Sequence, residues 1–176
     1  FPTTLNPIIQ CGHRPVFVDV ELDTYNIDVD LIEKAITEKV KSIVVPHTLG
    51  NPCNLDVLTE ICQKHDLKLV EDACDALGSR YDNRYVSTFG DLGTFSFYPA
   101  HHMTTGEGGM VVTNDEELAE KVRGYRDWGR LCNCDPCLEV ERKEEGYLCP
   151  KRLNFKIGDV PYDRKYAYGY IGYNLK

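Results

Sequence analysis

Short runs of apolar residues recur along the chain at intervals that leave room for a helix between them. Each run is rich in valine, isoleucine, leucine or phenylalanine and ends near a polar or charged residue. Runs of this length and composition are typical of buried strands. The pattern predicts five strands, at residues 14–20, 41–47, 67–72, 93–98 and 110–113.

Amphipathic stretches lie between these runs, and each follows a residue that can cap a helix. An aspartate or asparagine side chain at a helix start accepts a hydrogen bond from a backbone N–H of the first turn. The expected helices run from Asp28 to residue 39, from Asn54 or Asp56 to His65, and from Asn114 or Asp115 to Arg126. Alternating strands and helices predict an α/β fold with a mostly parallel sheet covered by helices.

The length and the two ends of the chain bear on its domain organisation. The 176 residues, 42% of them hydrophobic, suffice for one domain with a buried core. Both ends look cut, because a Pro-Thr-Thr-Leu-Asn-Pro stretch that reads as a loop opens the chain and an aromatic run, 166–173, closes it. We therefore expect residues 1–176 to be a fragment. Residues 131–163 lack periodicity and indicate a long ordered insertion or a metal-organised, cysteine-rich loop.

Charge and hydropathy exclude two classes of function. The net charge is −8, and acidic and basic residues are interspersed, so the sequence gives no continuous basic face for nucleic acid. No apolar run reaches the roughly 18 residues of a membrane span, and no cationic segment precedes an apolar one at the start. A cytoplasmic protein is therefore favoured. Eight cysteines in an α/β pattern favour thiols kept for metal or redox chemistry over a disulfide scaffold.

Polar side chains follow two of the expected strands. Asp72 ends one strand, Ser96 ends another, and His101 and His102 come in the next loop. Ligands of open α/β sheets bind at the carboxyl ends of the strands, so these groups could converge on one crevice. The spacing alone leaves open a plainer reading, in which Asp72 caps a loop or pairs with a cation and the histidines are half solvated. His47 is expected to be a structural hydrogen-bonding residue.

The segment SFYPAHHMTTGEGG, from Ser96 to Gly109, resembles the active-site segment of the DegT/DnrJ/EryC1/StrS sugar aminotransferases. That family has Ser-Phe, a lysine and Gly-Glu-Gly-Gly in the same register. Further matching stretches are PVFVD at 15–19, HTLGNP at 47–52, EDACDALG at 71–78 and GYN at 172–174. The resemblance implies the three-layer α/β/α large domain of the fold-type I, aspartate aminotransferase-like enzymes. It also implies that the C-terminal small domain is absent from residues 1–176.

The resemblance further implies contacts with a vitamin B6 phosphate. Asp72 would pair with the pyridine nitrogen and keep it protonated, so that the ring acts as an electron sink. Ser96 would hold the cofactor phosphate. We expect Asp75 at the cofactor as well, although it stands where many relatives have glutamine, and this departure weakens the case for a ring contact. Asn174 resembles an asparagine that reaches the phosphate in a neighbouring subunit, which implies a homodimer.

His101 departs from the family pattern because it occupies the position of the family's lysine. Imidazole cannot form the Schiff base that anchors pyridoxal phosphate, so we expect a non-covalent cofactor, in the form of pyridoxamine phosphate. Imidazole can still act as a general base near neutral pH. The same substitution occurs in the sugar 3-dehydrases, where the histidine takes a proton from the cofactor methylene and the C3 hydroxyl leaves the sugar.

The cysteines distinguish two kinds of 3-dehydrase, one that finishes by hydrolysis and one that carries a 2Fe-2S cluster. The spacing of Cys74, Cys132 and Cys134 resembles the cluster pattern of the second kind. Cys149 is preferred over Cys137 as fourth ligand, because the residues after Cys149 match those after the last ligand of that kind. The alternative is a structural zinc bound by Cys132, Cys134, Cys137 and Cys149, with Cys74 as a small core residue.

The combined hypothesis is a 3-dehydrase that depends on pyridoxamine phosphate and a 2Fe-2S cluster. Its substrate would be a nucleotide-linked 4-keto-6-deoxyhexose, on the route to 3-deoxy or 3,6-dideoxy sugars of lipopolysaccharide or natural products. An NADH-dependent iron–sulfur flavin reductase is the expected electron donor. The alternatives are a nucleotide-sugar aminotransferase and a non-catalytic relative with a zinc loop.

Overall fold

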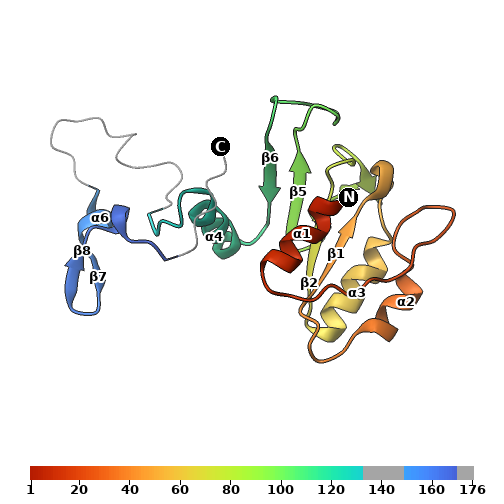
Figure 1. The fold of residues 1–176 in the computed structure, drawn as a ribbon, viewed down its shortest axis with the longest axis horizontal. Coiled ribbons are helices and arrows are strands. Elements are labelled where there is room, and N and C mark those ends of the chain that lie inside the picture. Colours follow the sequence, from red (N-terminus) through yellow and green to blue (C-terminus); the bar gives the residue numbers. More distant parts are fainter. Residues whose placement is uncertain (133–148, 170–176) are drawn as a thin grey trace. The chain divides into compact units, whose positions relative to one another are not determined.

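A computed structural model describes residues 1–132 and 149–169 of the chain (Figure 1). The chain divides into two compact units, residues 1–114 and 115–176. Each unit is described by itself below. Within the described residues, no helix is both long and apolar enough to cross a membrane.

The first unit contains a four-stranded sheet in the order β1-β2-β5-β6. Its strands are β1 (Ser42–Pro46), β2 (Lys68–Asp72), β5 (Leu92–Ser96) and β6 (Gly109–Val112). The strands β1, β2 and β5 are parallel, and β6 runs antiparallel to β5. The expected mostly parallel α/β sheet is thereby confirmed, and four of the five predicted strands are present.

The helices of the first unit begin where capping residues predict. Asp28 accepts a hydrogen bond from Asp30 N–H at the start of α2 (Val29–Ala35), and Asn54 accepts one from Val57 N–H at the start of α3 (Leu55–His65). The predicted helix from Asp28 ends four residues early. The remaining elements of the unit are α1 (Pro2–Gln10), the 3-10 turn η1 (Thr48–Gly50), and a hairpin of β3 (Arg80–Tyr81) and β4 (Arg84–Tyr85).

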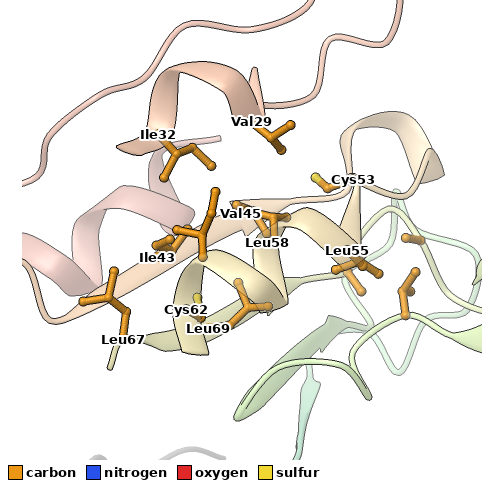
Figure 2. Packing of buried hydrophobic residues seen from close by; sticks show 14 residues of the cluster. Val29, Ile32, Ile43, Val45, Cys53, Leu55, Leu58, Cys62, Leu67 and Leu69 are labelled. Carbon is orange, nitrogen blue, oxygen red and sulfur yellow. The ribbon is translucent and has the colours of Figure 1, made fainter. Parts of the chain in front are cut away.

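The core lies between α2, α3 and one face of the sheet (Figure 2). Side chains alternate between the two faces of a strand, and every second residue of β1 and β2 is buried. Ile43 pairs with Leu69, and Val45 pairs with Glu71, so these side chains share the helix-covered face. Leu58 of α3 packs among them. Asp72 projects from the opposite face and contacts α1, which gives the helix–sheet–helix layering.

Glu71 is a fully buried carboxylate in the middle of this core. Its Oε1 accepts hydrogen bonds from the N–H groups of Phe89 and Gly90, at 2.9 and 2.7 Å. Its Oε2 accepts from Ser87 N–H at 2.7 Å and lies 3.0 Å from His47 Nε2. Burial raises the pKa of Glu71, but these hydrogen bonds outweigh burial and hold the pKa below its usual value. Glu71 is therefore ionised.

His47 is the buried partner of Glu71, and its tautomer follows from its two contacts. Cys53 N–H donates to His47 Nδ1 at 3.1 Å, so the proton of the neutral ring is on Nε2 and points to Glu71. The structural role predicted for His47 is thereby confirmed. Because His47 directly follows β1 and Glu71 lies in β2, the pair fixes the loop after β1 against the neighbouring strand.

Gly93 has no side chain, and this leaves room for Ser87 to pack close to Glu71. A Cβ on Gly93 would lie 2.2 Å from Ser87 Cβ, closer than two carbon atoms can approach. Gly93 is paired with Glu71 in the sheet, on the same face. Ser87 itself has φ +65°, which brings its N–H onto the carboxylate. The space left by Gly93 and the backbone conformation of Ser87 together allow the Ser87 N–H to reach Glu71.

Two predictions for the start of the chain are wrong. Residues 2–10, expected as a loop, form α1; Pro2 lies in the first turn, where a backbone N–H is not needed. Residues 14–20, expected as a strand, pair with no other strand among the described residues except for the single bridge Val20–Ile27. Apolar alternation favours extended backbone, but a strand also requires a hydrogen-bonded neighbour, which the local pattern does not specify.

The second unit begins with α4 (Glu116–Arg126), where Asp115 caps the first turn as predicted. It continues with the short helix α6 (Pro150–Leu153), the strands β7 (Phe155–Ile157) and β8 (Val160–Tyr162), and the 3-10 turn η2 (Arg164–Tyr166). The strands β7 and β8 form an antiparallel hairpin around Gly158, which has φ +61°. The described part of 131–163 is therefore more regular than its lack of periodicity indicates, because a two-residue Gly-Asp turn suffices to pair such short strands.

Contacts within the second unit fasten both flanks of the segment 132–149. Before it, Leu131 N–H donates to Ala167 O, and Gly169 N–H donates to Gly129 O, both at 2.9 Å. After it, Arg152 forms a two-pronged ion pair with Asp163, with N–O distances of 2.8 and 2.9 Å. The flanks are therefore held by described residues.

The Glu71 site yields a prediction about stability. In Glu71→Gln an amide NH2 group replaces one carboxylate oxygen and faces backbone N–H groups that need an acceptor. We expect a loss of about 2–4 kcal/mol in the free energy of unfolding at neutral pH. Because the folded pKa of Glu71 is lowered, its stabilisation is present above the unfolded pKa and is lost as pH falls through the folded pKa. The difference between variant and wild type should therefore shrink below about pH 4.5.

Urea unfolding at several pH values measures this difference. Glu60→Gln, the same chemical change at an exposed position of α3, is the matched control and should leave the free energy of unfolding nearly unchanged. Equal losses for the two variants would contradict the role given to Glu71.

Candidate functional site

The carboxyl ends of β2 and β5 bring predicted site residues to one face of the sheet. Asp72 of β2 is paired with Thr94 of β5, and Ser96 follows two positions further along the same strand. Paired residues, and residues two apart in a strand, point to the same face. Asp72, Thr94 and Ser96 therefore share the face opposite the one that holds Glu71.

Asp72 is partly buried and its carboxylate is held at both oxygens. Thr4 Oγ1 of α1 donates to Asp72 Oδ2 at 2.7 Å, and Cys74 N–H donates to Oδ1 at 3.2 Å. Burial raises the pKa of Asp72, but the hydrogen bonds from Cys74 and Thr4 outweigh it, so the pKa lies below its usual value. The carboxylate is ionised, and beside the hydrogen bonds from Thr4 and from the N–H and thiol of Cys74 it retains a lone pair for a further donor.

Ser96 ends β5 with its hydroxyl in a defined arrangement. Its Oγ accepts a hydrogen bond from Tyr98 N–H at 3.2 Å, which leaves the hydroxyl hydrogen available to an acceptor such as a phosphate oxygen. The following loop is closed at its base, because Phe97 N–H donates to Gly108 O and Thr105 N–H donates to Phe97 O. Ser96 thus stands at the entry of a loop that returns to β6.

His101 lies in this loop and contacts Asp75. Its Nδ1 is 3.1 Å from Asp75 Oδ1, and its ring meets the ring of Tyr98 edge to face, with the ring centres 6.4 Å apart. The His101 side chain is 21% exposed, whereas His102 is exposed to solvent. His101 is therefore the histidine that contacts Asp75. The adjacent His102 differs from it in being exposed to solvent.

Asp75 sits in a tight turn whose backbone is packed from two sides. Ala73 and Ala76 are fully buried on either side of it, and Ala76 N–H closes the turn onto Ala73 O at 2.9 Å. On the outside, Gly50 approaches so closely that a Cβ there would lie 2.8 Å from Asp75 O. Gly50 also has φ +83°, a backbone conformation that disfavours a side chain. Both this conformation and the close contact with Asp75 therefore require glycine here.

The predicted cluster ligands fall in both units. Cys74 lies beside Asp72 in the first unit and is partly buried; burial, together with the hydrogen bond and the charge of Asp72, raises the pKa of its thiol to about 12. Cys132 is partly buried and Cys149 is buried, both in the second unit. Cys134 and Cys137 lie outside the described residues, as does Asn174. Within the described residues, no group of three or more histidine, cysteine or acidic side chains gathers as a metal site.

Two residues of this region do not follow from sequence reasoning. Thr4 carries no local signal, since 68 positions separate it from Asp72. Glu71 could have been found, because an acidic residue at an inward-facing position of a buried strand requires several donors around it. Thr4 of α1 binds the Asp72 carboxylate directly, and Glu71 precedes Asp72 in β2.

Comparison with known proteins identifies the family. The sequence profile of the DegT/DnrJ/EryC1/StrS aminotransferase family matches residues 1–141. The chain belongs to this family. The DegT/DnrJ/EryC1/StrS resemblance of the segment 96–109 and the aspartate aminotransferase-like fold expected from it are thereby confirmed.

Individual family members are similar over the entire chain. The lipopolysaccharide biosynthesis protein RfbH of Salmonella typhimurium is 53% identical over 100% of this chain. The dTDP-4-dehydro-2,6-dideoxy-D-glucose 3-dehydratase of Saccharopolyspora spinosa is 52% identical, again over 100%. Among solved structures, GDP-4-keto-6-deoxy-D-mannose-3-dehydratase of E. coli with bound hydrated PLP has a TM-score of 0.77 and 31% identity, and the match covers 99% of this chain.

The chain spans only part of each of these family members. It covers 39% of RfbH, 37% of the S. spinosa 3-dehydratase and 41% of the E. coli structure. The part that it matches includes Asp72, Ser96 and His101.

Proposed function

We propose that the protein with this chain is a 3-dehydrase that removes the C3 hydroxyl of a nucleotide-linked 4-keto-6-deoxyhexose, using pyridoxamine phosphate and a 2Fe-2S cluster. The observation that carries the proposal is an imidazole, His101, on the loop where the family's lysine is expected. The printed names of two similar proteins, 3-dehydratases of a dTDP sugar and of a GDP sugar, support the reaction. The name of RfbH supports a place in lipopolysaccharide biosynthesis.

The residues described around Asp72 fit a vitamin B6 phosphate. An ionised, partly buried carboxylate with a spare lone pair suits a protonated pyridine nitrogen, and a serine hydroxyl with an available hydrogen suits a phosphate oxygen. Asp72 and Ser96 would therefore hold the two ends of the cofactor, with Thr4 orienting Asp72. When bound, the cofactor supplies an electron sink for the bond changes at the sugar.

His101 would act as the general base of the reaction. An imidazole forms no stable imine with a cofactor aldehyde, so the cofactor would be held by non-covalent contacts alone. With Nδ1 directed at Asp75, the nitrogen available for proton transfer is Nε2. The same residue argues against the aminotransferase alternative, in which a lysine amine is needed at this position.

The cluster ligands would be Cys74, Cys132, Cys134 and Cys149, with Cys137 as the alternative to Cys149. Four thiolates are the donor set that 2Fe-2S clusters take, and binding would displace the proton that the Cys74 thiol carries in the metal-free protein. A bound cluster supplies single electrons, which a separate NADH-dependent iron–sulfur flavin reductase would provide. A homodimer is proposed from the resemblance of Asn174 to the family asparagine that reaches across subunits.

A threonine pair in α1 tests the role of Asp72. Thr4→Val removes the hydroxyl that orients the carboxylate, and we expect the affinity for pyridoxal phosphate to fall about three- to tenfold. Thr3→Val makes the same change at the exposed neighbouring position and should leave the affinity unchanged. Absorbance titration of the cofactor measures both affinities, and equal affinities of the two variants would contradict the orienting role given to Thr4.

Borohydride reduction and a histidine pair test the base. We expect no covalent trapping of cofactor by the wild-type protein, and a loss of about a hundredfold or more in 3-deoxygenation by His101→Asn with cofactor affinity retained. His102→Asn is the matched control and should keep full turnover. His101→Lys, which restores an amine, should trap the cofactor. Trapping on the wild-type chain would favour the aminotransferase alternative.

Metal analysis of anaerobically purified protein tests the cluster. We expect about two iron and two sulfide per chain. Cys149→Ser should lose most of the iron, whereas Cys137→Ser and Cys11→Ser, the latter at an exposed position, should keep it. Zinc in place of iron would support the structural-zinc alternative and remove the electron-transfer role.

A further inference from the structure

We infer that Asp75 is the positioning residue for His101, and that its carboxylate fixes the imidazole as the tautomer with the proton on Nδ1 and the lone pair on Nε2. The inference deepens the proposed function, on which its catalytic part rests. It assigns Asp75 to the histidine in place of the cofactor contact that the sequence resemblance implies.

The chemistry of the two groups sets the tautomer. A carboxylate has no hydrogen to donate, so an imidazole nitrogen 3.1 Å from its oxygen is best matched by carrying a hydrogen itself. In a neutral ring only one nitrogen is protonated, so the lone pair of His101 is then on Nε2. This nitrogen is on the side of the ring away from Asp75, where a proton can be accepted.

The surroundings fix the direction of the contact. The turn that carries Asp75 is held by buried alanines on its flanks and by the close approach of Gly50 on its outside. Gly50 is held in turn, because Ser79 Oγ donates to Gly50 O at 2.8 Å and the loop begins at the buried His47. The His101 ring also rests edge to face against Tyr98, while its backbone N–H donates to Tyr98 O at 3.0 Å. The carboxylate and the ring thus approach each other from two anchored segments.

The exposure of the Asp75 and His101 side chains indicates that their contact positions the ring and does not stabilise the fold. The Asp75 side chain is 55% exposed and that of His101 is 21% exposed. Ion pairs in such surroundings contribute little to stability, because water screens the charges. A substitution at Asp75 should therefore leave the unfolding midpoint unchanged while it alters the state of the ring.

Asp75→Asn tests the inference in selectively 15N-histidine-labelled protein, with the His101 signals assigned by their absence from His101→Asn. In the wild type we expect the chemical shifts of a protonated Nδ1 and an unprotonated Nε2. In Asp75→Asn we expect a mixture of tautomers, because an amide can donate or accept. Asp23→Asn is the matched control at an exposed position and should keep the wild-type shifts. An unchanged tautomer in Asp75→Asn would overturn the inference.

Turnover provides the second readout. In Asp75→Asn, kcat for 3-deoxygenation should fall about ten- to hundredfold with KM for the sugar nearly constant, because a misdirected base affects the chemical step and not substrate binding. Asp75→Glu, which restores the charge, should recover part of the loss. A kcat equal to that of the wild type would overturn the inference.

The two hypotheses fail separately. Loss of tautomer control with intact base chemistry would be seen as altered shifts and unchanged kcat, which refutes positioning. Full turnover by His101→Asn would refute the proposed function, while the shifts of the wild-type ring would still report on the contact with Asp75.

Discussion

The first unit is organised around a charge that water does not reach. Glu71 lies in the strand that also carries Asp72. Three of its four donors come from the loop before β5, and the fourth, His47, directly follows the neighbouring strand β1. A buried carboxylate without such donors would be strongly destabilising, so the loops must adopt the conformations that supply them. Because adjacent residues of a strand point to opposite faces, fixing Glu71 inward fixes Asp72 outward.

The same carboxylate connects the core with the site on the other face. Through His47 it holds the loop that reaches Gly50, and Gly50 packs against the backbone of Asp75. The order of contacts runs from a buried ion to a loop, from the loop to a turn, and from the turn to His101. Each step uses a close approach or a hydrogen bond, and none needs a large apolar surface. The partly exposed pair of Asp75 and His101 is thereby connected to the buried pair of Glu71 and His47.

Local signals in the sequence were enough for the elements whose stability is local. The starts of α2, α3 and α4 could be predicted because a single side chain satisfies the first N–H groups of each helix. The segment 14–20 was mispredicted because strand formation depends on a partner elsewhere. The apolar runs placed Asp72 and Ser96 at the ends of strands and His101 in the following loop, where the structure has them. The contact of Thr4 with Asp72 and that of Asp75 with His101 required the tertiary structure, since residues distant in sequence meet in each.

The fastening of the flanks of the segment 132–149 bears on how such a chain tolerates change. The backbone pairing of Leu131 with Ala167 and the ion pair of Arg152 with Asp163 keep the two flanks in place whatever lies between them. Each flank thus has a contact of its own outside the interval. A change confined to residues 133–148 therefore removes neither the pairing of Leu131 with Ala167 nor the ion pair of Arg152 with Asp163.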